Sequence, residues 1–433
     1  MIRRSISLGV VLATSISAAS CDSTVWLDDT LPSLTAVFAS GACQTSPNQI
    51  DVSVVLVNQT DSASSNILPT TRVAKEGATP VSELINSQSF KFNPPPIMEA
   101  KVQQGLLDAG DAYGEPEDGL MVGDPLTVQL SPQNVTFEWS SPDPEAQRIP
   151  LLILLMDQSH SVLGLSRSEQ QWGSDIGHQR ITFFSTLIKS LDERFEVAML
   201  TFSGFTSDVD NDGSMVNRPV RNKDIATAAL EDLKFSAKYE ARTPLNQALS
   251  DTKTMIEGLA ADTYDPVVVV FTDGLESGDN SMGAPTVEEL APFFVQRHIP
   301  VHTIQLKAQQ DPNPSSGDLE AEKERPKPLE NMSLLACQTG GDFYFIRNAE
   351  DFTNNNALGT MLRNRLSGRW SLKVQTTMFN SFMNVDAPGI MLTTELEATL
   401  AGEVQRFNAA QTIESQTSVV KTDNRIWISN QPQ

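Results

Sequence analysis

The feature that most constrains the fold of this chain is an uninterrupted apolar run that ends in polar residues. Residues 151–156 are all apolar, and Asp157, Ser159 and Ser161 follow at alternate positions. A run of this length predicts a strand buried on both faces, as in a parallel sheet that carries helices on each side. Three oxygen-bearing side chains are therefore expected at the carboxyl edge of that sheet.

Two more oxygen-bearing side chains stand where later elements begin or end. Thr243 precedes Pro244 and a helical stretch, and Asp273 follows the strand-like run 267–272. In open α/β sheets, ligands bind outside the carboxyl ends of the strands. Hydroxyl and carboxylate oxygens suit Mg²⁺, Mn²⁺ or Ca²⁺ better than zinc. We therefore predict one divalent-cation site formed by Asp157, Ser159, Ser161, Thr243 and Asp273.

The motifs Asp-x-Ser-x-Ser, Thr-Pro-Leu and Thr-Asp-Gly, in this order, resemble the metal-ion-dependent adhesion site of von Willebrand factor type A domains. The resemblance covers roughly residues 148–366. It implies that the two serines and the threonine touch the ion directly or through water. It also implies that the aspartates often act through water and that a carboxylate of a partner protein fills the last position. His160 stands where the family usually has Gly, and we interpret it as a solvent-facing loop residue, not a ligand.

The resemblance and the hydrophobic pattern predict the same fold class. This is an α/β, Rossmann-like, doubly wound and mostly parallel sheet, flanked by β-rich N- and C-terminal regions. Strands are expected at 196–202, 267–271, 299–306 and 342–346, and helices at 286–297 and 329–338. Residues 395–404 fit either a strand or a helix.

We expect five parts along the chain. They are a lipoprotein-type signal peptide (1–21), an irregular tether (22–44), a β-rich accessory region (45–147), the von Willebrand factor type A domain (148–366) and a β-rich C-terminal region (367–433). Alternating apolar residues at 126–130 and near Trp370 support the two flanking regions. Because both flanks are β-rich, we hypothesise that 367–433 packs against 45–147.

The N-terminus has the features of an export signal. Two arginines precede a short apolar stretch, Leu8–Ile16, which is too short to span a bilayer, and small residues lead to Cys21. Two interpretations fit: acylation of Cys21 as in a bacterial lipoprotein, or ordinary cleavage near Ala19 or Ser20. The first is favoured, although Ala18 stands where lipoproteins prefer Leu. It predicts a protein of the cell envelope that faces the periplasm or the surface and touches the membrane only through this lipid; the second predicts a secreted protein.

Two other cysteines and one acidic loop have alternative interpretations. Cys43 and Cys337 form a disulfide in one interpretation, since an exported chain meets oxidising conditions, and remain two free thiols in the other. A weak calcium loop is indicated by Asp208, Asp210 and Asp212. Its expected twelfth-position Glu is replaced by Pro219, so an acidic turn is the favoured interpretation.

Charge and motifs limit the function. The net charge of −23 argues against binding to nucleic acid or directly to anionic lipid, because like charges repel. No nucleophile elbow, His-Glu-x-x-His or phosphate-binding loop occurs, and His302 lies inside a predicted strand as a core residue. We therefore predict a non-enzymatic, exported adhesion or protein-binding module that captures an acidic group of a partner at a Mg²⁺ (or Mn²⁺/Ca²⁺) site. The alternatives are a metal-indifferent structural subunit of an envelope assembly and, least favoured, a metal-assisted hydrolase.

Overall fold

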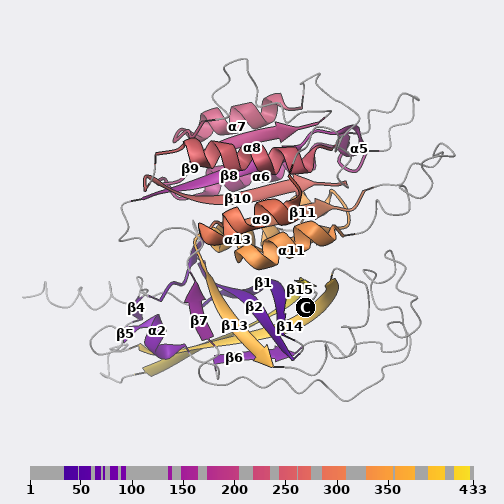
Figure 1. The fold of residues 1–433 in the computed structure, drawn as a ribbon. Coiled ribbons are helices and arrows are strands. Elements are labelled where there is room, and N and C mark those ends of the chain that lie inside the picture. The colour runs from indigo at the N-terminus through magenta and orange to yellow at the C-terminus, as the bar shows by residue number, and fades with distance from the viewer. Residues whose placement is uncertain are drawn as a thin grey trace, which may run out of the picture.

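The computed structural model of the chain describes seventeen stretches of residues. They are 34–46, 48–59, 64–69, 72–73, 79–85, 89–93, 135–138, 148–163, 173–203, 218–234, 243–260, 262–274, 285–308, 328–354, 356–375, 389–404 and 414–429. Three predictions lie outside them: the export signal with Cys21, the acidic loop of Asp208, Asp210 and Asp212, and the strand at 126–130. The described residues form a helix-covered parallel sheet stacked beside a second, mixed sheet (Figure 1).

The parallel sheet has five strands in the order β12-β11-β10-β8-β9. Their bounds are β8 Ile149–Asp157, β9 Glu196–Phe202, β10 Tyr264–Thr272, β11 Val301–Leu306 and β12 Phe343–Ile346. Every pair of neighbours runs parallel. The apolar runs predicted as buried strands thus form the middle of the sheet, and the predicted fold class is confirmed.

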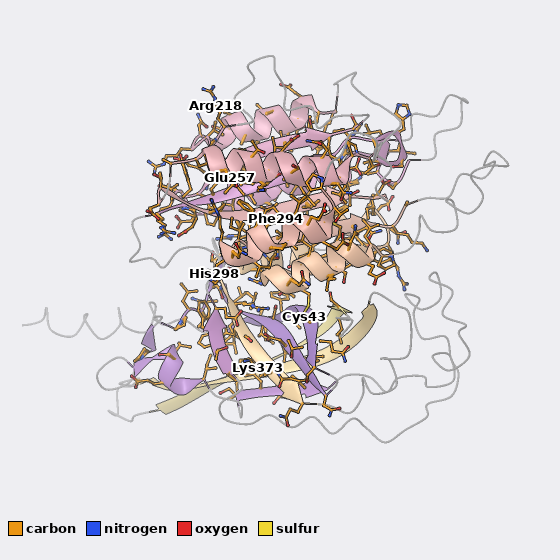
Figure 2. The ribbon with its side chains drawn as sticks, in the orientation of Figure 1. Cys43, Arg218, Glu257, Phe294, His298 and Lys373 are labelled. Carbon is orange, nitrogen blue, oxygen red and sulfur yellow. A yellow bond between two sulfur atoms is a disulfide. The ribbon has the colours of Figure 1, made fainter. Side chains whose placement is uncertain are left out.

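Helices cover both faces of this sheet, as the continuous apolar strands require. The helices are α5 His160–Leu163, α6 Gln179–Ser190, α7 Lys223–Asp232, α8 Leu245–Gly258, α9 Val287–Gln296, α11 Glu330–Thr339, α12 Asp351–Asn354 and α13 Asn356–Arg365. Leu152 and Leu154 point to the face packed by α6, α7, α12 and α13, whereas Leu151 and Ile153 point to α8, α9 and α11. Figure 2 marks Phe294, whose fully buried ring anchors α9 in the second layer. Burying one such side chain contributes about 1.5–3 kcal/mol.

The order of strands places a topological switch between β8 and β10. From β8 the chain moves to β9 on one side, and it then returns to β10 on the other side. At such a switch the connections after the two strands leave toward opposite faces, and a crevice opens between their carboxyl ends. Asp157 and Thr272 are the last residues of these two strands, so the predicted site lies beside this switch.

The mixed sheet is assembled from both ends of the chain. Its strands are β1 Ala36–Ser46, β2 Gln49–Gln59, β3 Ser64–Asn66, β6 Phe90–Asn93, β7 Val135–Glu138, β13 Arg369–Gln375, β14 Gly389–Val404 and β15 Glu414–Ser429. Strand β13 pairs with β2 and β7, and β15 runs parallel to β1. Two short strands, β4 Arg72–Val73 and β5 Thr79–Pro80, pair separately next to α2 Val81–Leu84.

One segment differs from the prediction made from sequence, and a second segment resolves an alternative that the sequence left open. Residues 36–44, which we expected to be part of an irregular tether, lie in β1 and are mostly buried. Val37 packs into the core of the mixed sheet and Phe38 into the core beneath α13, so both faces are covered and no polar alternation marks the strand. Residues 395–404, which fitted strand or helix, belong to β14.

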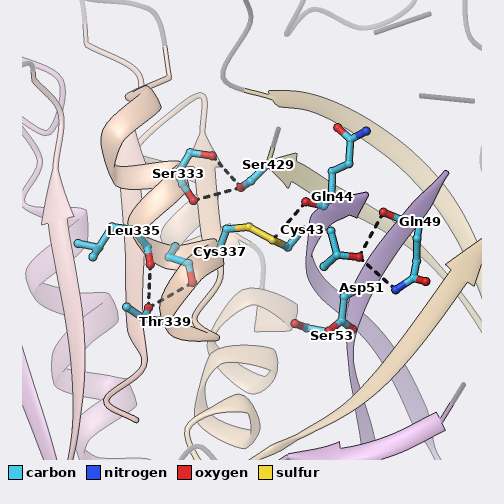
Figure 3. Close-up of a disulfide and its surroundings, with 12 residues drawn as sticks. Cys43, Gln44, Gln49, Asp51, Ser53, Ser333, Leu335, Cys337, Thr339 and Ser429 are labelled. Carbon is cyan, nitrogen blue, oxygen red and sulfur yellow. Dashed lines mark hydrogen bonds between the residues drawn. A yellow bond between two sulfur atoms is a disulfide. The ribbon is translucent and has the colours of Figure 1, made fainter. Parts of the chain in front are cut away.

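The two sheets are fastened together covalently and by hydrogen bonds. Cys43 of β1 and Cys337 of α11 form a disulfide with a Cα–Cα distance of 5.4 Å. Beside it, the hydroxyls of Ser333 and Ser429 lie 2.7 Å apart (Figure 3). No helix among the described stretches is long and apolar enough to cross a membrane.

A buried carboxylate, Asp342, links the two sheets at the amino end of β12. Its Oδ2 accepts hydrogen bonds from the Ser40 hydroxyl of β1 at 2.8 Å and from Arg365 Nε of α13 at 2.6 Å. Its backbone N–H donates to His302 Nδ1 at 3.1 Å. The predicted core position of His302 holds, but His302 Nε2 is buried without a hydrogen-bond partner among the described residues. Gly41 is required here, because a Cβ at this position would lie 2.8 Å from Asp342 Oδ1.

The charges around Asp342 set its protonation. Burial raises the pKa of Asp342, but the charges of Arg365, His302 and Arg369 outweigh burial and lower this pKa to about 2. Burial and the charge of Arg365 lower the pKa of His302 to about 3. At neutral pH, the link between the sheets is therefore a carboxylate paired with arginine beside an uncharged imidazole.

Candidate metal site

Asp157 is fixed in place at the carboxyl end of β8. Its Oδ1 accepts a hydrogen bond from the Ser159 N–H at 2.8 Å, which tightens the turn that leaves the strand. Its Oδ2 accepts one from the Thr272 hydroxyl at 2.7 Å, at the end of the neighbouring strand β10. The carboxylate therefore ties the two strands of the switch together, and it is fully buried.

The two serines connect this turn to Asp273. The Oγ atoms of Ser159 and Ser161 lie 3.0 Å apart. The Ser161 hydroxyl donates to Asp273 Oδ1 at 2.7 Å, across 112 residues of sequence. Three of the predicted oxygen groups thus form one continuous chain of contacts.

Thr243 lies on the same side of the switch. A Cβ added to Gly274 would lie 3.6 Å from Thr243 Oγ1 and 3.8 Å from Ser161 Oγ. The side-chain oxygens of Thr243 and Ser161 therefore border the same small space beside Gly274, which the absence of a side chain leaves open. Pro244 sits at the N-cap position of α8, so Thr243 is held directly before a buried helix start. The structure brings all five predicted residues to one edge of the sheet.

The electrostatics of this edge suit a cation. Asp157 and Asp273 are both fully buried. Burial raises the pKa of Asp157 more than hydrogen bonds from Ser159 and Thr272 and the charge of Arg180 lower it. Hydroxyl donors cannot neutralise a buried carboxylate, whereas a divalent ion can.

The chemistry of the donors also limits the kind of ion. Serine and threonine hydroxyls and aspartate oxygens are ligands for hard cations of the Mg²⁺, Mn²⁺ and Ca²⁺ type. Within the described stretches, no group of three or more His, Cys, Asp or Glu side chains could hold a metal ion. The fit to a hard divalent cation rests on the hydroxyl and aspartate oxygens of the five candidate residues.

Comparison with known proteins identifies the central part of the chain. Residues 152–356 match the family model of the von Willebrand factor type A (VWA) domain. This part of the chain is a VWA domain. The matched span contains all five residues of the candidate site, whereas every described strand of the mixed sheet lies outside it. No curated protein matches the chain.

Several solved structures are similar to parts of the chain. The pilus adhesin SpaC from Lactobacillus rhamnosus GG is 11% identical over 73% of this chain and 50% of its own, with a TM-score of 0.35. Proximal thread matrix protein 1 from the mussel byssus, with a zinc-occupied MIDAS motif, is 13% identical over 51% of this chain and 48% of its own, with a TM-score of 0.33. The vWF domain of the pilus tip protein Mfa5 from Porphyromonas gingivalis is 10% identical over 51% of this chain and 97% of its own, with a TM-score of 0.33. The chain spans about half the length of the mussel protein.

The VWA domain contains one site residue that sequence reasoning missed. The hydroxyl of Ser174, in the turn before α6, donates a short hydrogen bond to Asp273 Oδ2. Nothing in the sequence marks this serine, because its partner lies 99 residues away. His160 also differs from expectation: it is the first residue of α5 and is half-buried, not a solvent-facing loop residue.

Proposed function

We propose that the VWA domain binds a divalent cation at the carboxyl edge of its sheet and uses this ion to capture an acidic group of a partner protein. Asp157, Ser159, Ser161, Thr243 and Asp273 would hold the ion, with Mg²⁺ as the first candidate and Mn²⁺ or Ca²⁺ as alternatives. The bound ion would supply positive charge and a coordination position for a carboxylate. The chain would thus act as an adhesion or protein-binding module.

The observation that carries this proposal is the connected set of oxygens at the β8–β10 switch. Ser159, Ser161 and Asp273 are joined by contacts of 3.0 and 2.7 Å. Asp157 Oδ2 and Asp273 Oδ1 each accept a hydrogen bond from a hydroxyl, and burial raises the pKa of Asp157 in spite of its hydrogen bonds and the charge of Arg180, so a nearby cation would stabilise its charged form. A hard cation at this point would satisfy these oxygens together.

The first test is the effect of metal ions on stability. A ligand that binds only the folded state raises the free energy of unfolding, by about 2.7 kcal/mol at 100 times its Kd. We expect Mg²⁺, Mn²⁺ or Ca²⁺ to raise the melting temperature of the chelator-treated protein. Asp157→Asn and Asp273→Asn should remove this response. Asp251→Asn should retain it, because Asp251 is also a carboxylate whose pKa is raised by burial but lies within α8.

The proposal is contradicted if both aspartate variants keep the response. It is also contradicted if none of the three ions raises the melting temperature of the wild type. Either result would favour the alternative function, a structural subunit that does not depend on a metal ion.

The second test concerns the carboxylate of the partner. Mn²⁺ bound to the protein should increase the relaxation rate of water protons through its bound water. Acetate, as a minimal carboxylate probe, should displace that water and lower the relaxation rate, whereas uncharged acetamide should not. Equal responses to acetate and acetamide would argue against carboxylate capture even if the metal binds.

We also propose that the protein is exported and held in the cell envelope by an acylated Cys21. The support is the sequence pattern of residues 1–21. Metabolic labelling with a fatty acid in a bacterial host should mark the wild type and not Cys21→Ala. An unlabelled wild type with a new N-terminus at residue 20 or 21 would indicate ordinary cleavage and secretion.

A further inference from the structure

Ser174 connects the two strand ends that carry the candidate metal site. Its hydroxyl donates to Asp273 Oδ2, after β10, and its backbone N–H donates to the Ser161 carbonyl at 2.8 Å, after β8. The residue is buried, with 7% of its surface exposed. Ser174 therefore contacts the carboxylate of Asp273 and also the backbone of the Asp-x-Ser-x-Ser turn.

The hydroxyl of Ser174 restricts how the Asp273 carboxylate is turned. With Ser161 on Oδ1 and Ser174 on Oδ2, each carboxylate oxygen has a hydrogen-bond donor. The terminal torsion of an aspartate is otherwise broad, so two donors on opposite oxygens select one orientation. Groups that orient a metal ligand in this way strengthen metal binding, and their loss typically lowers affinity 10- to 100-fold.

The segment that carries Ser174 is itself held by a buried ion pair. Asp175 accepts from the N–H groups of Gln179 and Arg180 at 2.7 and 3.2 Å, and so caps α6, whose N-cap residue His178 makes no side-chain cap. Arg180 Nη1 donates to Asp175 Oδ2 at 2.6 Å, and both side chains are fully buried.

The second terminal nitrogen of the Arg180 guanidinium contacts the Asp-x-Ser-x-Ser turn. Its Nη2 donates to Gln158 Oε1 at 3.0 Å, and Gln158 is the residue between Asp157 and Ser159. The buried pair therefore anchors the Ser174 turn and the Asp-x-Ser-x-Ser turn to the same helix start. A serine fixed in this way has little freedom to leave Asp273.

We propose that Ser174 is a positioning residue of the candidate metal site, which orients the Asp273 carboxylate for the ion and is kept in register by the Asp175–Arg180–Gln158 contacts. This inference rests on the proposed function. It predicts that the Ser174 hydroxyl contributes to metal affinity without contacting the ion.

The test compares Mn²⁺ affinity, by calorimetry, with stability in chelator. Ser174→Ala should weaken Mn²⁺ binding about tenfold or more. The matched control is Ser185→Ala, a buried serine of α6 that donates to Glu231 Oε1 at 3.3 Å, away from the site. Ser185→Ala should leave Mn²⁺ affinity within about twofold of the wild type, although both variants lose a buried hydroxyl.

A second pair of variants keeps the test decisive if Ser174→Ala folds poorly. Ser174→Thr and Ser174→Val have the same shape, but only threonine retains the hydroxyl. Stronger Mn²⁺ binding by the threonine variant supports the proposal. Equal affinities in this pair, or unchanged or tighter binding by Ser174→Ala, overturn it while the wild type still binds. A wild type that binds no Mn²⁺ instead overturns the proposed metal site itself.

Discussion

Asp157 and Asp342 are both buried in the VWA domain, but they lie at opposite ends of parallel strands and in different surroundings. Asp342, at the amino end of β12, is paired with Arg365, and the nearby positive charges lower its pKa to about 2 in spite of burial. Asp157, at the carboxyl end of β8, is held by a backbone amide and a threonine hydroxyl, and burial raises its pKa. The chain thus neutralises the carboxylate that joins its two sheets with its own arginine. Among the described residues, none forms an ion pair with the Asp157 carboxylate; under the proposed function, a cation bound at this edge would stabilise its charged form.

The largest expected effect is the loss of the arginine that compensates Asp342. Arg365→Met leaves a buried carboxylate without its closest positive charge, which typically costs about 3–5 kcal/mol of unfolding free energy. Urea unfolding measures this loss. The control is Arg194→Met: Arg194 pairs with Asp192 at 3.0 Å, but both side chains are more than half exposed, so this change should cost less than about 1 kcal/mol. Similar losses of unfolding free energy in the two variants would show that Arg365 stabilises the buried Asp342 no more than an exposed ion pair stabilises the surface.

The disulfide should support the Asp342 end of the domain and not the metal end. Cys43→Ser combined with Cys337→Ser opens a loop closed over a separation of 294 residues, and should lower the unfolding free energy by about 2–4 kcal/mol. Mn²⁺ affinity at a temperature where the variant is folded should not change. A parallel loss of metal affinity would mean that the two ends of the sheet are coupled and do not act independently.

The pH dependence of stability tests the uncharged state of His302. Its pKa is about 3 in the folded protein against an ordinary 6.5, so between these values the unfolded chain binds a proton that the folded protein does not. Stability should therefore fall as the pH drops below 6.5, by up to about 1.4 kcal/mol per pH unit from this residue. Asp342, whose pKa falls from 3.8 to about 2, adds a further loss below pH 3.8.

Two substitutions separate His302 from the other groups that titrate in this range. His302→Asn can still accept the hydrogen bond from Asp342 N–H, and it should flatten the stability curve between pH 6.5 and 5. His298→Asn removes an exposed imidazole whose backbone has a positive φ of 53°, a conformation that asparagine tolerates. An equal flattening by the two variants would contradict the assignment to His302.

The part of the fold that sequence predicted is the part built from local and continuous signals. Strand β9 occupies its predicted bounds, and the apolar runs at 151–156 and 267–271 became β8 and β10. Each of these strands is recognisable by itself, because it is buried on both faces and bounded by helical periodicity. The same reasoning predicted that the five candidate residues lie at one edge of the sheet, because the carboxyl ends of parallel strands point in the same direction.

The features that sequence missed depend on partners far away in the chain. Strand β1 is short of large apolar residues around Gly41; it pairs with β2 and with β15 near the end of the chain, and its Ser40 contacts Asp342, about 300 residues later. Ser174 resembles any polar turn residue until the fold brings Asp273 to it. The pairing of β13 with β2 joins regions separated by the whole VWA domain; the β-rich character of both flanks supports the hypothesis that they pack together, but it indicates neither the strand order nor the register. No local pattern encodes these pairings.

The Cys43–Cys337 bond also determines how the molecule would carry mechanical tension. It joins β1 directly to α11, so a pull on the chain ahead of β1 would enter the VWA domain through one covalent link. Strands β2 to β7 lie in the stretch of chain that this link bypasses. If force broke the hydrogen bonds of the mixed sheet, the disulfide would still connect the start of β1 to the VWA domain. Force would then be transmitted toward the candidate metal site through a covalent bond.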